Sequence, residues 1–369
     1  MKIAIVHDYI KEYGGAEKVL EELHAIFPKA PIYTSVYLPS YLGPHRDRFE
    51  EMDIRASFLQ KIPFIAKLIS PIRLISPWVF KSFNFNGFDV VLVSQTGAYF
   101  PHALNKKNAK LISYTHTPPR YLYGYKTARN ISKNKVFYLL AHIMNHFLRI
   151  VDFNTAQNVD VFIANSEEVR SRIKKFYRRS AQVIYPPVVV SSLTASSVSP
   201  AQSYYLTGGR LARAKGTDVV IRAFNKNGKK LKIFGKGFAG FEEELKVLSK
   251  NNIEFVGEVS NEEKFSLMTH AQAFIFSSFD EDFGITPVES MMLGTPVIAF
   301  KSGGVQETVR EGVSGIFYEE NSPEKLNETI EKFESPIWQK KLRKTSMQQV
   351  TRRFSLEEFQ KNIQHAIRL

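Results

Sequence analysis

The chain has 369 residues, a formal net charge of +14, 44% hydrophobic residues and no cysteine. Its length exceeds the size at which one hydrophobic core usually splits, so we expect two domains. The lack of cysteine excludes disulfides, thiolate zinc sites and cysteine nucleophiles. The nine histidines include no HExxH pattern, so a metal site has weak support.

The N-terminal stretch MKIAIVHDYI is typical of a first β-strand. It has no charged leader region, long apolar run or cleavage site, so it does not look like a signal peptide. No segment approaches ~18 uninterrupted apolar residues, so we expect no transmembrane helix. These patterns predict a cytoplasmic protein.

The first half of the chain alternates strand-like runs with helical patterns. The strand-like runs are KIAIVHDY, FDVVLVSQ, AKLISYTH and VDVFIANS. Gly14 and Gly15 form a permissive loop, and residues 16–27 have the apolar spacing of a helix. This alternation predicts parallel βαβ units.

The positive charge is concentrated in one part of the sequence. Residues 54–151 contain fourteen Lys or Arg residues and a single acidic residue, Asp89. Residues 54–86 are apolar and basic, and three prolines divide them into short pieces. The asymmetry predicts that something anionic lies next to this region.

A second series of strand and helix patterns follows a nearly uncharged stretch rich in Ser, Thr and Pro. That stretch is typical of a linker. We predict an N-terminal domain at residues 1–185, a linker at 186–202 and a C-terminal domain at 203–354. A capping box and helical spacing at 355–369 predict a last helix, which we expect to pack back on the first domain. The predicted fold class is α/β, with two facing, doubly wound, Rossmann-like domains and a cleft between them.

Four stretches of the second half lie where a strand gives way to a loop or helix, the place where open α/β sheets bind ligands. They are GGRLARAKGTD, FGKGF, EDFGITPVE and SGGVQETV. In the first, Arg210 and Lys215 accompany Gly209, a combination that suits a diphosphate. The second contains Gly235 and Lys236, but a glycine turn without any ligand explains it equally well.

The stretch EDFGITPVE carries two carboxylates, Glu281 and Glu289. Pro287 suits the first position of a helix, with Thr286 as its N-cap. The free N–H groups there, preceded by Gly284, would form an anion cradle. Glu289 would accept hydrogen bonds from a ribose diol, and Glu281 would face a sugar beyond the phosphates. The pattern therefore indicates a nucleotide sugar.

The residues DED at 280–282 imitate the D-x-D signature of a metal site. They overlap the pair of glutamates, and Arg210 and Lys215 can supply the positive charge that a metal would otherwise provide. We therefore predict no metal and no cofactor, since the nucleotide sugar is a substrate.

The Gly14-Gly15 loop, GRLARAKGTDVVIRAF, FVGEVSNEE and the E-x7-E pattern follow one another in an order that resembles the retaining family 4 glycosyltransferases of GT-B fold. The resemblance covers nearly the whole chain. In addition, YTHTPPRYLYG resembles the mannosyltransferases of bacterial O-antigen and related polysaccharide assembly.

The resemblance implies roles for single residues. The catalytic set is Arg210, Lys215, Glu281 and His116. The donor-binding set is Gly14, Gly15, Gly209, Gly235, Lys236, Phe283, Gly284, Ile285, Thr286 and Glu289. Arg210 and Lys215 would hold the diphosphate, Glu289 the ribose and Glu281 the transferred sugar, while His116 would lie near the reacting sugar. For the glutamates and His116, a solvated or structural role is the alternative.

The implied activity is metal-independent transfer of a hexose, mannose from GDP-mannose being favoured, to a saccharide acceptor carried on a polyprenyl diphosphate. A UDP-sugar-dependent transferase of the same fold is an alternative. Two more distant alternatives are a nucleotide-sugar epimerase and a non-catalytic subunit that binds an anion. Nucleic acid is not expected as a partner, because the basic region lacks RNP-like and helix-turn-helix patterns.

Such acceptors imply a membrane, and residues 54–86 suit one. We predict peripheral binding to the inner face of the cytoplasmic membrane through Lys61, Lys67, Arg73 and Lys81, with short amphipathic pieces lying in the interface. The alternative is that the apolar residues of this segment belong to the core and the cations only solvate its surface.

Overall fold

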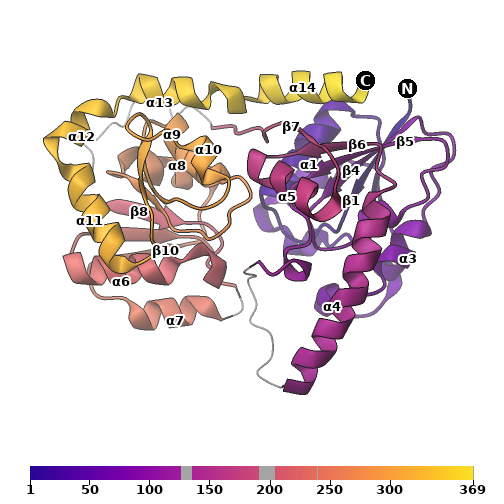
Figure 1. Ribbon diagram of the computed structural model, residues 1–369, viewed down its shortest axis with the longest axis horizontal. Helices are drawn as coiled ribbons and strands as arrows, with labels where there is room; N and C mark the ends of the chain where they lie inside the picture. The colour runs from indigo at the N-terminus through magenta and orange to yellow at the C-terminus, as the bar shows by residue number, and fades with distance from the viewer. Residues whose placement is uncertain (126–134, 191–203, 239, 369) are drawn as a thin grey trace. The chain divides into compact units, whose positions relative to one another are not determined.

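The computed structural model describes residues 1–125, 135–190, 204–238 and 240–368 (Figure 1). The chain divides into two compact units. Unit 1 contains the chain up to Tyr125, the stretch that ends at Pro187 and the C-terminal segment from Leu356. Unit 2 contains Val188 to Ser355. Residues 191–202 of the predicted linker and 126–134 of the basic region lie outside the described residues.

Unit 1 is built on a seven-stranded sheet in which every pairing is parallel, in the order β3-β2-β1-β4-β5-β6-β7. The strands are β1 (Ile3–His7), β2 (Ile32–Thr34), β3 (Ile54–Ala56), β4 (Val90–Gln95), β5 (Lys110–Thr115), β6 (Val161–Ala164) and β7 (Gln182–Val183). The chain moves outward from β1 to β3 and then returns to β4. The strand order therefore reverses between β1 and β4.

The helices of unit 1 cover both faces of this sheet. They are α1 (Gly15–Ile26), α2 (Ile69–Ile72), α3 (Ser76–Lys81), α4 (Lys135–Ala156), α5 (Glu167–Tyr177) and α14 (Leu356–Arg368). Alternate residues of β1 point to opposite faces. Ile3 and Ile5 join one buried cluster with residues of α1 and α14, whereas Ala4 and Val6 join another with residues of α3 and α5.

The C-terminal helix α14 is part of unit 1, where it contacts α1. Its apolar residues Phe359 and Ile363 are buried in the same cluster as Leu20 and Leu23 of α1. The helical spacing of apolar residues in the C-terminal sequence therefore marks a face that is covered in the folded chain.

Residues 54–86 form short elements. After β3 they comprise the 3₁₀ turns η3 (Phe58–Lys61) and η4 (Ile65–Lys67), followed by α2 and α3. The apolar side chains of this segment are buried, partly buried or exposed, and Ile54, Ile69 and Phe83 are partly buried. Buried are Leu59, Ile65, Ile72, Val79, Phe80 and Phe85, and exposed are Phe58, Ile62, Phe64, Leu68, Leu74, Ile75 and Trp78. The core interpretation therefore accounts for only some of these residues.

Unit 2 is built on a six-stranded sheet, again with parallel pairings only, in the order β10-β9-β8-β11-β12-β13. Its strands are β8 (Tyr205–Gly208), β9 (Leu231–Phe234), β10 (Ile253–Gly257), β11 (Phe274–Phe276), β12 (Val297–Phe300) and β13 (Gly315–Tyr318). The strand order reverses between β8 and β11.

The described helices of unit 2 are α6 (Thr217–Asn227), α7 (Phe241–Leu248), α8 (Asn261–His270), α9 (Ile285–Met292), α10 (Val305–Thr308), α11 (Pro323–Glu334), α12 (Pro336–Lys341) and α13 (Lys344–Thr351). Together the two parallel sheets confirm the predicted α/β fold class. Among the described residues, no helix is both long enough and apolar enough to cross a membrane.

Candidate functional site

The loops after β8 and β11 meet at the reversal of strand order in unit 2. Lys215 ends a 3₁₀ turn at Arg213–Lys215, and Glu281 follows β11. The two side chains form an ion pair, with 2.6 Å between Lys215 Nζ and Glu281 Oε2. The hydroxyl of Ser278 donates to the same carboxylate oxygen at 2.5 Å. The structure thus joins the residue predicted to hold a diphosphate with the one predicted to contact a sugar.

The Glu281 loop is held by the backbone of the loop after β12. Gly304 N donates to the carbonyl oxygen of Glu281 at 2.7 Å. A Cβ atom at Gly303 would lie only 2.3 Å from that oxygen, so the approach requires glycine. Asp280 has a φ of 49°, a left-handed conformation that is uncommon for a residue with a side chain. The predicted stretch SGGVQETV therefore positions Glu281 through backbone contacts of Gly303 and Gly304.

The glycines of the first two stretches have different surroundings. A Cβ at Gly235 would lie 1.9 Å from the carbonyl oxygen of Gly209, so Gly235 is required by the packing of two loops. A Cβ at Gly209 would meet nothing within 4 Å, which leaves an open surface beside Arg210. Arg210 is exposed, with its guanidinium 5.9 Å from the ring centroid of Phe238. Lys236 is also exposed and pairs with Glu258 at 3.0 Å.

Helix α9 begins earlier than the sequence pattern predicts. Its first residue is Ile285 and its N-cap is Gly284, in a left-handed conformation with φ 89°. Pro287 therefore occupies the third helical position rather than the first, and Thr286 is not the cap. The first four N–H groups of a helix have no partner within it, so proline fits there without losing a helical hydrogen bond. Phe283, just before the cap, is buried against Phe354.

Glu289 is almost completely buried within α9. Its side chain is 2% exposed and pairs with Lys264 of α8, with 2.9 Å between Nζ and Oε1. A buried carboxylate keeps its charge only where a partner offsets the loss of hydration. Lys264 therefore acts as a positioning residue for Glu289, and a solvated helix surface does not describe this glutamate.

In unit 1, polar side chains gather where the strand order reverses between β1 and β4. Ser94 Oγ, at the end of β4, lies 3.1 Å from His7 Nδ1 and 2.9 Å from His116 Nε2. All three residues are buried. Burial, together with the nearby His7, lowers the pKa of His116 to about 3. His116 is therefore neutral near pH 7 and can position a hydroxyl group, but it does not carry a positive charge.

Asp8 lies next to this group of side chains and is completely buried. Its Oδ2 accepts hydrogen bonds from Thr96 Oγ1 at 2.7 Å, Ala98 N at 3.0 Å and Tyr99 N at 3.1 Å. Its Oδ1 has no hydrogen-bond partner among the described residues. Burial raises the pKa of Asp8 above its ordinary value, although the His7 charge and these hydrogen bonds act against the rise.

The glycine pair at the start of α1 is connected through Glu17 to the buried polar side chains around His7. Gly14 is the N-cap and Gly15 is the first helical residue, so the predicted loop ends one residue earlier. Gly14 N donates to Glu17 Oε2 at 2.8 Å, while Glu17 Oε1 lies 3.6 Å from His7 Nε2. Glu17 thus connects the glycine turn to His7.

The predicted membrane cations do not all face solvent. Lys61, Lys67 and Lys81 are exposed. Arg73 is only partly exposed, and its guanidinium lies 4.0 Å from the ring centroid of Tyr121. Three of the four cations are therefore available at the surface.

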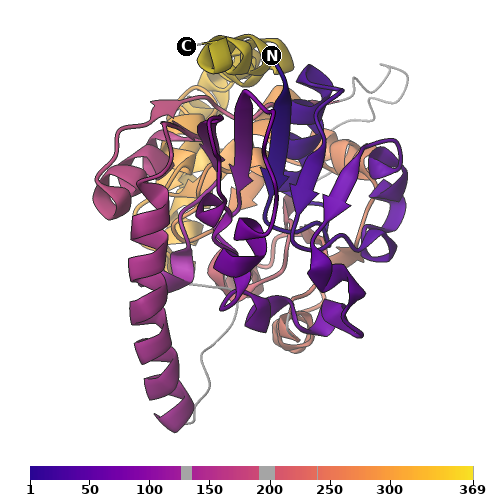
Figure 2. The ribbon, with the colours of Figure 1, turned by 90° about the vertical axis from the view of Figure 1, so that its right-hand side faces the viewer.

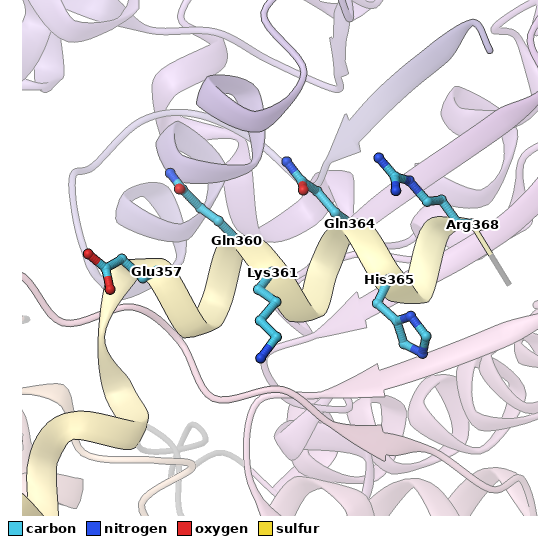
Figure 3. Close-up of a pocket in the computed structure, with 6 residues that line it drawn as sticks. All are labelled: Glu357, Gln360, Lys361, Gln364, His365 and Arg368. Atoms are coloured by element: carbon cyan, nitrogen blue, oxygen red, sulfur yellow. The ribbon is translucent and has the colours of Figure 1, made fainter.

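Two other features give no site among the described residues. A shallow hollow on α14 is lined by side chains of that single helix, and they do not converge. Gln360, Gln364 and Arg368 point to one side, and Lys361 and His365 to the other (Figure 3). No group of three or more His, Asp or Glu residues within the described ranges is placed to hold a metal ion.

The sequence did not predict a site role for six residues that the structure places beside the predicted ones. They are His7, Asp8, Glu17, Ser94, Lys264 and Ser278. Four of them, His7, Asp8, Ser94 and Ser278, lie within two residues of a strand's carboxyl end, at the sheet edge where open α/β sheets bind ligands. His7 and Asp8 were visible in the stretch HDYI, and Ser94 in VLVSQ. The rule on strand ends could have selected them. Lys264 and Glu17 have no comparable signal, because each lies inside a helix and away from any strand end.

Comparison with known families agrees with this architecture. Residues 13–192 match the family described as "Glycosyltransferase Family 4", and residues 195–348 match "Glycosyl transferases group 1". The two matches adjoin and span nearly the whole chain. The fold and these matches define a glycosyltransferase. More particularly, the chain belongs to the family 4 glycosyltransferases of GT-B fold.

Individual relatives are distant. The alpha-1,3/1,6-mannosyltransferase ALG2 of Dictyostelium discoideum is 24% identical, over 98% of this chain and 97% of its own length. The structure of Anabaena HepE in complex with UDP and glucose matches with a TM-score of 0.74 and 17% identity, over 100% of this chain and 99% of that one. Sucrose-phosphate synthase of Thermosynechococcus elongatus also gives a TM-score of 0.74 at 17% identity, over 100% and 98%. At this level of identity, the structural likeness bears on the fold alone.

Gly303→Ala should displace the Glu281 loop, because its Cβ would lie 2.3 Å from the Glu281 carbonyl oxygen. A shift of order 1 Å in a reacting group costs about 10²-fold in rate, and we expect a loss of that size in glycosyl transfer. Gly312→Ala is the matched control. Gly312 has a similar positive φ of 75°, against 68° for Gly303, but open space around its Cβ. Equal activity of the two variants would contradict the role of the loop contact.

Proposed function

We propose that this protein is a retaining glycosyltransferase that transfers mannose from GDP-mannose to a saccharide acceptor in the assembly of a bacterial surface polysaccharide such as O-antigen. One observation carries the proposal. The Lys215–Glu281 ion pair lies where the strand order of unit 2 reverses, on loops adjoining the open surface at Gly209 and the start of α9. A cation, a carboxylate and free helix N–H groups at such a point suit a sugar diphosphate.

Binding of the donor would break this ion pair and would give each of its two residues a new partner. The diphosphate would take over Lys215 and would also contact Arg210 and the N–H groups of Ile285 and Thr286. Glu281, relieved of its lysine, would then accept hydrogen bonds from the transferred sugar. Glu289, held by Lys264 at 2.9 Å, would keep its charge and accept the ribose hydroxyls. In the absence of donor, the Lys215–Glu281 pair keeps both charges satisfied.

The chemistry would require no protein nucleophile. The bond from the sugar C1 to the β-phosphate oxygen breaks, and the acceptor hydroxyl forms its new bond to C1 on the same face. The departing phosphate takes the hydroxyl proton. Preorganised positive charge at the β-phosphate is then the main source of rate enhancement. Neutral His116, held by Ser94, would orient a sugar hydroxyl.

Two observations bear on the sugar nucleotide. The ALG2 relatives of this chain are named mannosyltransferases, and their match supports mannose. HepE is a structural neighbour that binds UDP and UDP-glucose, and it favours a second candidate, a UDP-sugar-dependent transferase of the same fold. A panel of nucleotide sugars separates the two candidates.

The acceptor is proposed to be lipid-linked, with the protein peripheral on the inner face of the cytoplasmic membrane. The exposed cations Lys61, Lys67 and Lys81 support this location. Within the described part of the chain, none of the three makes an ion pair. A polyprenyl diphosphate and anionic lipid headgroups both complement such cations.

GDP-mannose should stabilise the protein in a thermal-unfolding panel. A ligand present at ~100 times its dissociation constant stabilises the bound state by about 2.7 kcal/mol. We expect GDP and GDP-mannose to raise the melting temperature, and UDP and UDP-glucose to have little effect at the same concentration. A larger shift with UDP-glucose selects the second candidate. The absence of a shift with every nucleotide contradicts the donor site.

Lys215→Ala and Arg210→Ala should each lower kcat by roughly 10²–10³, the scale for removing one preorganised charge-stabilising group. Lys229→Ala is the matched control, because Lys229 is 34% exposed and paired with Glu334 at 2.8 Å, much as Lys215 is 37% exposed and paired with Glu281. Lys229 lies before β9, at the opposite edge of the sheet. Initial rates at saturating donor measure the effect, and near-normal turnover of a variant removes that residue from the mechanism.

Activity should persist in excess EDTA. The motivating arrangement is Lys215 beside Glu281, because this lysine would balance the charge of the diphosphate in place of a metal. Asp280→Asn and Asp282→Asn should be tolerated better than Glu281→Gln. Loss of turnover with EDTA and its recovery with manganese would refute metal independence.

A further inference from the structure

Helix α4 leaves one whole apolar face uncovered. Leu139, Leu140, Ile143, Met144, Phe147 and Ile150 are each between 41% and 61% exposed. Their spacing places them along one side of the helix, with His142 and His146 at one border of this strip and Asn145 on the opposite side. Soluble proteins rarely expose large contiguous apolar patches, and those that they do expose often mark interaction sites.

The exposed face continues onto the neighbouring segment. Leu74 and Ile75, which precede α3, and Trp78 of α3 are 37%, 43% and 65% exposed. A hollow of about 270 Å³ joins the two helices, lined by Pro77 and Trp78 on the α3 side and Met144, Phe147 and Leu148 on the α4 side, with Lys81 also in its lining. These exposed apolar residues and the hollow are called the α3–α4 surface below.

Two further features indicate what kind of partner the α3–α4 surface suits. Residues 54–156 carry fourteen Lys or Arg residues and two acids, Asp89 and the buried Asp152 of α4, so the exposed apolar side chains lie in a strongly basic part of the sequence. Figure 2 shows the N-terminal half of α4 extending beyond the other elements of unit 1. Among the described residues, α4 does not qualify as a membrane-spanning helix.

We propose that the α3–α4 surface inserts into the boundary between headgroups and acyl chains of an anionic lipid bilayer. The apolar face of α4 would lie in the interface with the helix roughly parallel to the membrane, as amphipathic helices with a basic surround do. Trp78 would occupy the headgroup level that tryptophan favours. This goes beyond electrostatic docking, because the apolar contact would hold the protein when salt screens the lysines.

A second copy of the chain fits this surface less well. A two-fold symmetric contact would place the same patch against itself, so Lys81 and its neighbouring cations would meet their own copies. Anionic lipid provides both the apolar phase and the opposite charge. The proposal therefore commits to a bilayer and treats self-association as an outcome of the test.

The tryptophans provide a reporter. The chain contains two, exposed Trp78 in the α3–α4 surface and Trp338 in unit 2, which is 8% exposed. Full-length protein carrying Trp338→Phe leaves Trp78 as the only indole. With vesicles of phosphatidylcholine and phosphatidylglycerol, its emission should shift to the blue and be quenched by lipids brominated on their acyl chains. A bound fraction should remain after salt is raised.

The matched variants are two pairs of serine substitutions. Phe147→Ser with Ile150→Ser should lower the partition coefficient by roughly 10²-fold, since each large side chain removed from water contributes about tenfold or more. Val247→Ser with Ile337→Ser should leave it unchanged, because these residues are 88% and 70% exposed but belong to unit 2. All four residues are exposed, and unchanged thermal unfolding confirms that each variant folds.

Three results would overturn the proposal. They are unchanged Trp78 emission with vesicles, equal partitioning of the two double variants, and a blue shift without vesicles that accompanies a dimeric mass. Binding that disappears completely in high salt would leave only electrostatic docking and also counts against insertion. The assay contains neither nucleotide sugar nor acceptor, so its failure is distinguishable from a failure of the proposed activity.

Discussion

Every strand pairing in both sheets is parallel, and this polarity determines where the chemistry of the chain can lie. Parallel strands all run in the same direction, so their carboxyl ends meet at one edge of the sheet, and crossover connections return the chain to the other edge. Each sheet also has one point where the strand order reverses, β1/β4 in unit 1 and β8/β11 in unit 2. The candidate residues gather at these two points, where the loops of neighbouring strands diverge and where open parallel sheets bind ligands.

Charge in the candidate donor site is balanced by two ion pairs of different character. Glu289 and Lys264 are only 2% and 12% exposed, so breaking this pair costs more than breaking an ion pair at the surface. Lys215 and Glu281 are 37% and 16% exposed, so their mutual attraction is screened and either can exchange its partner for a ligand. The first pair is suited to holding a fixed geometry and the second to responding to a substrate. Backbone contacts at Gly303 and Gly304 keep the second pair in place.

Much of the architecture was predictable from local patterns. The longer buried strands, such as β1, β4 and β5, coincide with apolar runs in the sequence. Glycine-rich stretches mark the loops that follow β8, β9 and β12. The short strands β2, β3, β7 and β13 were not predicted, because an alternation is not detectable over two to four residues, whereas the four-residue β6 lies in the predicted stretch VDVFIANS. The start of α9 was misplaced by two residues, since proline is tolerated at any of the first helical positions and Gly284 was the true boundary.

The sequence by itself determined the fold class, the family resemblance, the concentration of positive charge and the stretches that carry the candidate donor site. Only the tertiary structure decided which of those residues meet. Lys215 and Glu281 are 66 positions apart, and Ser94 stands between His7 and His116 only because three strands align in register. It also decided that Arg73 turns toward Tyr121 and that the apolar face of α4 stays uncovered. Periodicity shows that a helix has an apolar face, but its exposure depends on neighbours that are distant in the chain.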